Sequence, residues 1–312
     1  MRTLLALALA LVLLVALCSA TLRLSQSGVG CTPWPTCYAQ ASAEAPRDAE
    51  IPAWQHTLRL THRISATVAG LAFVFIVAFG FGGWSRSQRV AGASLWALAA
   101  ALAFVGRITP SQLPAVVLAN LLGGHLLLAA LAWLLTPALQ SVDTLPSAIA
   151  RELSWPLWAF VLLVLVSGGL VSARTAVAAC ADGCGLDLAS WPDALAAWQP
   201  WRGNAAWADG IGTPMRQALL QLHVVLGALA MSVLCWAAWR VRRCTGAATV
   251  AALTALAAVS VALLGIGPLQ QALGLGAATA HSVLGGFTLA GSAALWRVLA
   301  PSAGRGARPR GA

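Results

Sequence analysis

The sequence predicts an all-α polytopic membrane protein in which eight transmembrane helices form two pseudo-symmetric four-helix bundles. Of the 312 residues, 59% are hydrophobic and only 9% are charged, so the chain is more apolar and much less charged than soluble globular domains usually are. Eight apolar runs are long enough to cross a bilayer, which takes about 20 residues each. Similar features recur in the two halves of the chain. We therefore expect the lipid bilayer to be the main partner of this protein.

The apolar runs follow one another along most of the chain. They lie near 3–20, 64–83, 91–106, 114–136, 155–174, 217–239, 245–267 and 277–299. The first run has a cationic start at Arg2 and ends in the small residues Ser19-Ala20, so a cleaved signal peptide is the alternative to a retained helix. We predict a retained helix, because its apolar core is long. Residues 301–312, rich in Gly and Arg, are predicted to form a disordered cytoplasmic tail.

The arginines carry a topology signal. All 19 basic residues are arginines and the formal charge is +10, which by itself would also suit a nucleic-acid partner. The arginines, however, stand mostly singly or in pairs at the ends of apolar runs, as expected for a membrane protein. With a cytoplasmic N-terminus, the inner segments carry eleven arginines against two acidic residues, and the outer segments eight against seven. This bias predicts both termini in the cytoplasm of a bacterial inner membrane, and no nucleic-acid partner.

Four of the seven cysteines lie in two long loops that this topology places outside. They are Cys31 and Cys37 in loop 21–60, and Cys180 and Cys184 in loop 175–215. An oxidising compartment favours disulfides, and the short spacings allow one in each loop. A metal site built from the four thiols is the weaker alternative, because the pairs lie in separate loops and neither has C-x-x-C spacing.

The two halves, 1–140 and 141–300, repeat one pattern. Each has a first span, an external loop with a cysteine pair and Trp-Pro, a helix that begins with an external histidine, and a fourth helix with Gly-Gly near its outer end. The matching features are Trp34-Pro35 and Trp191-Pro192, His62 and His223, and Gly123-Gly124 and Gly285-Gly286. A duplicated four-helix unit is the simplest explanation, since parallel repeats are a known membrane architecture.

Three of the five histidines are candidate metal ligands. His62, His223 and His281 each lie in the outer few residues of an apolar run, whereas His56 is expected in the loop and His125 lies deeper in the fourth helix. At about 1.5 Å per residue, His223 and His281 lie at matching depth. Bis-imidazole ligation of a haem iron by two facing helices fits this arrangement. A hydrogen bond from a buried neutral histidine to another helix is the alternative, and we favour a structural role for His125.

The surroundings of these histidines also suit a planar macrocycle. Each candidate is followed four residues later, on the same helix face, by a small residue: His62 by Ala66, His223 by Gly227 and His281 by Gly285. Arg63 offers a planar fork that can pair with a haem propionate at the membrane surface. The alternative for Arg63 is a side chain that reaches to the lipid headgroups.

Residues 23–38, Arg-Leu-Ser-Gln-Ser-Gly-Val-Gly-Cys-Thr-Pro-Trp-Pro-Thr-Cys-Tyr, closely resemble the first external loop of the haem A synthase family. These are eight-helix membrane enzymes that convert haem O to haem A for cytochrome oxidases. His62-Arg63 resembles the family's second-helix His-Arg. Residues 168–172, Gly-Gly-Leu-Val-Ser, followed by Cys180 and Cys184, are similar to its fifth helix and second cysteine loop. The resemblance covers roughly residues 15–300.

The resemblance implies two haem sites and a reaction. The C-terminal half would hold haem b between His223 and His281, where the family places its ligands. The N-terminal half would hold haem O or haem A, as substrate or product, on His62, and one ring methyl would be oxidised to a formyl group. The cysteines would form the disulfides Cys31–Cys37 and Cys180–Cys184. Haem O synthase, cytochrome oxidase assembly factors and a second copy of this chain are the protein partners that it suggests.

Two departures from the family pattern leave two hypotheses open. The family's glutamate three residues before the second-helix histidine is Arg59 here, and an arginine cannot accept a proton. The family motif His-Leu-Leu-Gly-Gly in the fourth helix begins here with Asn120, a poor haem ligand. His125 lies about 140° further round that helix, so it cannot replace the missing ligand without moving the haem.

The first hypothesis is a divergent haem A synthase in which His62 alone holds the substrate iron. The second is a non-catalytic protein with one haem b at His223 and His281, serving oxidase assembly or electron transfer. A transporter has little support, because the sequence shows no midplane charge and no broken helix.

Overall fold

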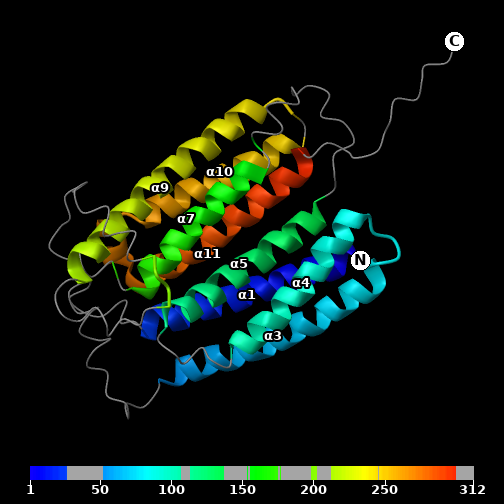
Figure 1. Cartoon of the computed structure of the whole chain (residues 1–312), viewed down its shortest axis with the longest axis horizontal. Helices are drawn as coiled ribbons and strands as arrows, with labels where there is room; N and C mark the ends of the chain where they lie inside the picture. Colours follow the sequence, from blue (N-terminus) through cyan, green and yellow to red (C-terminus); the bar gives the residue numbers. More distant parts are fainter. Residues whose placement is uncertain are drawn as a thin grey trace.

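The described part of the protein is entirely helical in its regular structure. The computed structural model describes residues 1–26, 52–106, 113–136, 153, 155–174, 176, 198–201, 212–244 and 246–299. Within these residues there are eight long helices and no strands (Figure 1). The helices are α1 (Arg2–Gln26), α3 (Ala53–Gly80), α4 (Arg86–Val105), α5 (Pro114–Leu135), α7 (Trp155–Ala173), α9 (Gly212–Val241), α10 (Ala247–Leu264) and α11 (Gly267–Leu299). Each is long and apolar enough to cross a membrane, so the predicted fold class is confirmed.

Local sequence explains where several helices begin. Leu and Ala dominate the helices, and a helix satisfies every backbone polar group internally, as the bilayer interior requires. Ser85 caps α4 in a capping box, because its hydroxyl accepts from the Gln88 backbone N–H at 3.4 Å while the Gln88 side chain accepts from the Ser85 N–H at 3.0 Å. Pro114 begins α5, a position where its missing N–H costs nothing.

Helix α3 begins earlier than hydropathy alone predicts. Residues 64–80 of the expected span near 64–83 form only the later part of a helix of 28 residues, which starts at Ala53, directly after Pro52, and ends at Gly80. At about 1.5 Å per residue this helix is longer than the roughly 30 Å of a hydrocarbon core. Its first turns therefore carry polar residues. The expectation that His56 lies in a loop is wrong, since His56 and His62 are both helical.

Helix α11 is broken, contrary to the expectation of unbroken helices. Gly274 has φ 52° and ψ −129° inside the span Gly267–Leu299, and only glycine adopts such a conformation readily. The break separates a short first segment from the long helix that carries His281. In transporters such breaks lie near the bilayer midplane. Gly274 instead lies close to where the apolar part of α11 begins, so the break does not support transport.

The helices pack as two sets of four with the same neighbour relations. In the N-terminal set, α1 packs on α3 and α5, and α4 packs on α3 and α5. In the C-terminal set, α7 packs on α9 and α11, and α10 packs on α9 and α11. The sets meet through α5 with α11, α1 with α11, and α5 with α7, so these four helices form the seam between them (Figure 1). The origin of the two sets by duplication stays a prediction.

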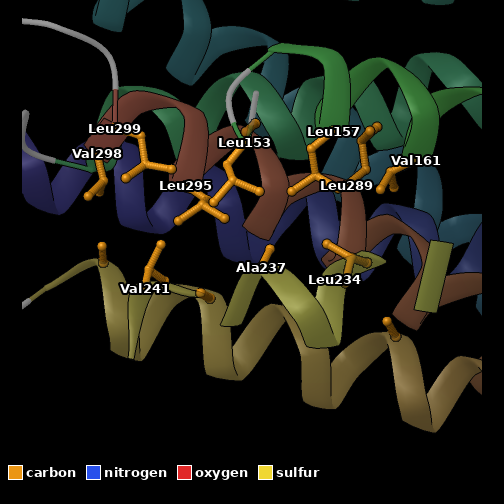
Figure 2. Packing of buried hydrophobic residues seen from close by; sticks show 14 of the residues in the cluster. Leu153, Leu157, Val161, Leu234, Ala237, Val241, Leu289, Leu295, Val298 and Leu299 are labelled. Atoms are coloured by element: carbon orange, nitrogen blue, oxygen red, sulfur yellow. The ribbon is translucent and has the colours of Figure 1, made fainter. Parts of the chain in front are cut away.

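The C-terminal set has a well-packed core that holds the helices of the candidate site. Figure 2 shows buried aliphatic side chains of α7, α9 and α11 packed against one another. Examples are Leu157, Leu234, Leu289 and Leu295. Inside a bilayer, helices associate through close packing rather than through the hydrophobic effect. This core therefore sets the relative positions of α7, α9 and α11.

Candidate functional site

Two histidines meet in the C-terminal set. His223 on α9 and His281 on α11 have ring centroids 6.3 Å apart, with ring planes inclined by 73°. Both side chains are half-buried. Among the histidines in the described part of the chain, this is the pair that the structure brings into ring contact. The predicted matching depth of His223 and His281 thus corresponds to an actual juxtaposition.

A serine of α7 orients His223. The Ser167 hydroxyl donates to the Val164 carbonyl at 2.7 Å and lies 2.9 Å from Nδ1 of His223. Because its only proton goes to Val164, the Ser167 oxygen must accept from the imidazole. We therefore assign the proton of neutral His223 to Nδ1. The lone pair of Nε2 is then available to a metal.

A backbone carbonyl orients His281 in the same way. Nδ1 of His281 lies 2.9 Å from the carbonyl oxygen of Val261, near the C-terminal end of α10. A carbonyl can only accept, so Nδ1 of His281 carries the proton and Nε2 keeps its lone pair. Histidines that ligate metals usually donate their other N–H to a carboxylate or a carbonyl in this manner. Both imidazoles are thus held in the tautomer that a ligand requires.

The ring separation suits a single metal ion bound by both histidines. Ring bonds of about 1.3 Å place each ring atom about 1.1 Å from the centroid. Metal–imidazole bonds are about 2.0–2.1 Å long. A metal held by both Nε2 atoms on opposite sides would therefore separate the centroids by about 6.2–6.4 Å. The observed 6.3 Å has the value that ligation of one iron by both residues would require, and an edge-to-face ring contact spans the same distance.

Two glycines make room for the imidazoles. A Cβ on Gly168 of α7 would lie 2.7 Å from Cε1 of His223, and a Cβ on Gly265 would lie 3.1 Å from Cε1 of His281. Side chains at these positions would push the rings away. Ser167, Gly168, Val261 and Gly265 were not predicted as site residues from the sequence. The only signal lay in Gly168, which begins the family-like segment 168–172.

The small residues that follow the histidines differ in their surroundings. A Cβ on Gly227 would meet nothing within 4 Å, so the helix surface beside His223 is open to a planar group, as expected. Gly285 is different, because a Cβ there would lie 2.9 Å from Leu165 of α7. That face of α11 is covered by a neighbouring helix. Ala66, after His62, is exposed.

The candidate residues of the N-terminal set are less enclosed. His62 and Arg59 are half-buried, and Arg63 is exposed. Arg59 and His62 lie three residues apart on α3, so they share one face of this helix. The cationic group therefore stands next to the candidate ligand. Clusters of three or more metal-binding side chains are absent from the residues that the structure covers.

His125 lies at the seam between the two sets. It is only 5% exposed, and its ring packs against Gly286 of α11, where a Cβ would lie 2.6 Å from Cδ2 and 3.0 Å from Nε2. Nδ1 of His125 is buried and has no hydrogen-bond partner among the described residues. Asn120 is half-buried on the same helix. His125 thus contacts the C-terminal set through α11.

The predicted disulfides and the tail fall outside the described residues. Cys31, Cys37, Cys180 and Cys184 all belong to segments that the structure does not describe, as do residues 301–312. The pairings Cys31–Cys37 and Cys180–Cys184 therefore stay predictions, and so does a disordered tail.

Comparison with known proteins agrees with the features described above. A family model described as cytochrome oxidase assembly protein, COX15-CtaA, matches residues 2–292. No curated protein matches the chain. The match covers nearly the whole chain and includes at least part of each of the eight helices. The chain is therefore a multi-pass membrane protein of the COX15-CtaA family, the haem A synthase family, with a role in haem A biosynthesis and cytochrome oxidase assembly.

Proposed function

We propose that this protein is a haem A synthase-type oxidoreductase of a bacterial inner membrane, which binds haem b in its C-terminal half and oxidises a ring methyl of haem O to a formyl group. The observation that carries this proposal is the pair His223 and His281. Their centroid separation of 6.3 Å suits one iron between them, and each Nδ1 already has an acceptor. Family membership supplies the link to haem A.

The residues around the pair prepare it for ligation. Ser167 and the Val261 carbonyl accept from the two Nδ1 atoms, which holds each ring in place and increases the basicity of Nε2. Gly168 and Gly265 leave the space that the rings need. His223 and His281 would hold the iron of a haem b, and the haem would supply one-electron transfer. The pair would thus serve electron movement rather than binding of the substrate.

His62 would hold the iron of the substrate haem in the N-terminal half. Arg63, exposed at the next position, offers a planar fork to a propionate. Arg59 shares a helix face with His62 and occupies the position of the family's carboxylate. A guanidinium cannot accept a proton. Any proton released from the substrate methyl would therefore have to go to another group in this protein.

A second candidate function is a non-catalytic haem b protein that serves oxidase assembly or electron transfer. Three observations favour it, namely Arg59 beside His62, Asn120 in the place of a family histidine, and the packing of His125 against Gly286. Together they leave His62 as the one histidine of the family pattern in the N-terminal half. Under this alternative the C-terminal haem site is kept and the substrate site has lost its activity.

One experiment separates the two functions. The full-length protein is expressed with a haem O synthase, and its haems are extracted and identified by chromatography. Haem A above the level of cells that lack this protein supports the synthase and excludes the non-catalytic function. Haem B alone, at one per chain and lost in His223→Ala, excludes the synthase. His56→Ala is the matched control, because His56 is exposed at the start of α3.

The proposal also includes an orientation and protein partners. Both termini would lie in the cytoplasm, which places His223 and His281 towards the outer face of the membrane. Haem O synthase would deliver the substrate, and oxidase assembly factors or a second copy of this chain would bind at helix faces. Reporter fusions after Gln26 and after Val105 test the orientation, since both helix ends should report the outer side and a fusion after Gly80 the inner side.

A further inference from the structure

Arg23 joins the two sets of helices close to the histidine pair. It lies in the last turns of α1, in the N-terminal set. Its Nη1 donates to the Ser172 hydroxyl of α7, and its Nη2 donates to the Ser282 hydroxyl of α11 at 3.1 Å. Both acceptors belong to the C-terminal set, and Ser282 directly follows His281 in the sequence. A side chain of one set thus reaches the backbone segment that carries a candidate ligand of the other.

We propose that Arg23 is a positioning residue that acts through Ser282 and Ser172 on the histidine pair and raises the redox potential of the haem bound there. This inference rests on the proposed haem site at His223 and His281. The guanidinium of Arg23 belongs to the N-terminal set, and the proposal gives it a function in the C-terminal set. Neither the family match nor the geometry of the pair alone provides that assignment.

The two terminal nitrogens of the Arg23 guanidinium contact α7, which carries Ser167, and α11, which carries His281. Ser282 directly follows His281, and Nδ1 of His281 donates to the backbone carbonyl of Val261 in α10. Ser172 lies five residues after Ser167, which orients His223 through its hydroxyl. Arg23 thus contacts the segments of α7 and α11 that adjoin Ser167 and His281. Hydrogen bonds from a planar guanidinium hold the two acceptors in a defined geometry, which a flexible ammonium group does less well.

The charge of Arg23 has a predictable effect on a nearby haem. The side chain is part-buried within the apolar bundle, where a charge costs free energy and usually has a function. The ferric haem carries one positive charge more than the ferrous haem, so a nearby cation disfavours the ferric form. Arg23 therefore stabilises the reduced haem. This direction holds whatever other groups interact with Arg23, because removing it always makes the surroundings more negative.

The test uses the full-length protein purified with its haem and a spectroelectrochemical titration of the midpoint potential. Arg23→Gln removes the charge and should lower the potential, so that the equilibrium constant for reduction falls by a factor on the order of ten, as expected for loss of one unit charge from a partly buried site. Arg23→Lys keeps the charge and should retain most of the potential. Arg240→Gln is the control, because Arg240 lies at the opposite end of α9, over Trp236.

The outcomes separate this inference from the haem site itself. A bis-imidazole absorption spectrum with an unchanged potential in Arg23→Gln would show that Arg23 is only a structural tie. Arg23→Met, which fills the seam with an apolar chain of similar length, takes the same titration if Arg23→Gln does not accumulate. Absence of bound haem from the unsubstituted protein would overturn the haem site and this inference together. A bound haem whose potential ignores Arg23 would overturn the inference alone.

Discussion

The two sets of helices share one packing arrangement but differ in what they place beside their histidines. In the C-terminal set, His223 and His281 face each other, and Ser167 and Val261 hold their Nδ1 atoms. In the N-terminal set, His62 stands beside a cation, and His125 packs into the seam. Helix packing depends on small and apolar residues along whole helices, whereas a site depends on a few polar residues. A site can therefore change while its scaffold persists.

The largest expected effect tests whether the C-terminal pair is the haem site. His223→Ala and His281→Ala should each remove nearly all bound haem b, because each removes one of the two residues that would hold its iron. The haem-to-protein ratio of the purified protein measures this. His62→Ala should leave haem b in place. Equal loss of haem b in His62→Ala would abolish the contrast between the two sets.

Removal of the serine that orients His223 should have the next largest effect. Ser167→Ala removes the hydroxyl that accepts from Nδ1 of His223, and loss of such a partner weakens metal binding by about 10–100-fold. Haem titration followed by absorbance gives the dissociation constant. Ser232→Ala is the matched control, since Ser232 is exposed on α9 and bonds only to its own helix at Ala228. Identical affinities in the two variants would show that Ser167 does not orient the ligand.

A single added methyl group tests whether the His223 ring needs the space above Gly168. Gly168→Ala would place its Cβ 2.7 Å from Cε1 of His223, so the ring must move. Overpacking of this kind costs about 1–3 kcal/mol, and we expect haem affinity to fall about tenfold or more. Gly70→Ala on α3 introduces the same methyl group where nothing lies within 4 Å. Haem affinity should be unchanged there, and an equal loss in both variants would contradict the proposed close contact.

The smallest expected effect sharpens the comparison from the N-terminal side. Arg59→Glu restores a carboxylate that can accept a proton beside His62, and we expect haem A in cells with haem O synthase to rise a few-fold, roughly the effect of about 1 kcal/mol. Asn120→His in addition should increase it further. Chromatography of extracted haems is the measurement. No gain in haem A from either variant would contradict the view that this protein is a simply weakened synthase.

Much of the fold followed from composition and local signals. Apolar runs predicted eight spans, and α5 matches its predicted run closely because Pro114 marks its start. Hydropathy did not predict the start of α3 at Ala53, because hydropathy marks only the part of a helix inside the bilayer. The helix begins earlier in the chain, directly after Pro52. The break at Gly274 was also missed. Glycine adopts helical and non-helical backbone conformations with similar ease, so a glycine in an apolar run does not by itself indicate a break in the helix.

The sequence by itself determined the eight membrane helices, the candidate histidines and the family-like segments, because hydropathy and residue identity act over short stretches of chain. Only the tertiary structure decided which groups meet. It brought Ser167 to His223, the Val261 carbonyl to His281, Gly286 to His125, and Arg23 to Ser282. These contacts join helices that are distant in the chain, and a backbone carbonyl or the space above a glycine carries no mark in the sequence. They depend on how whole helices pack against each other.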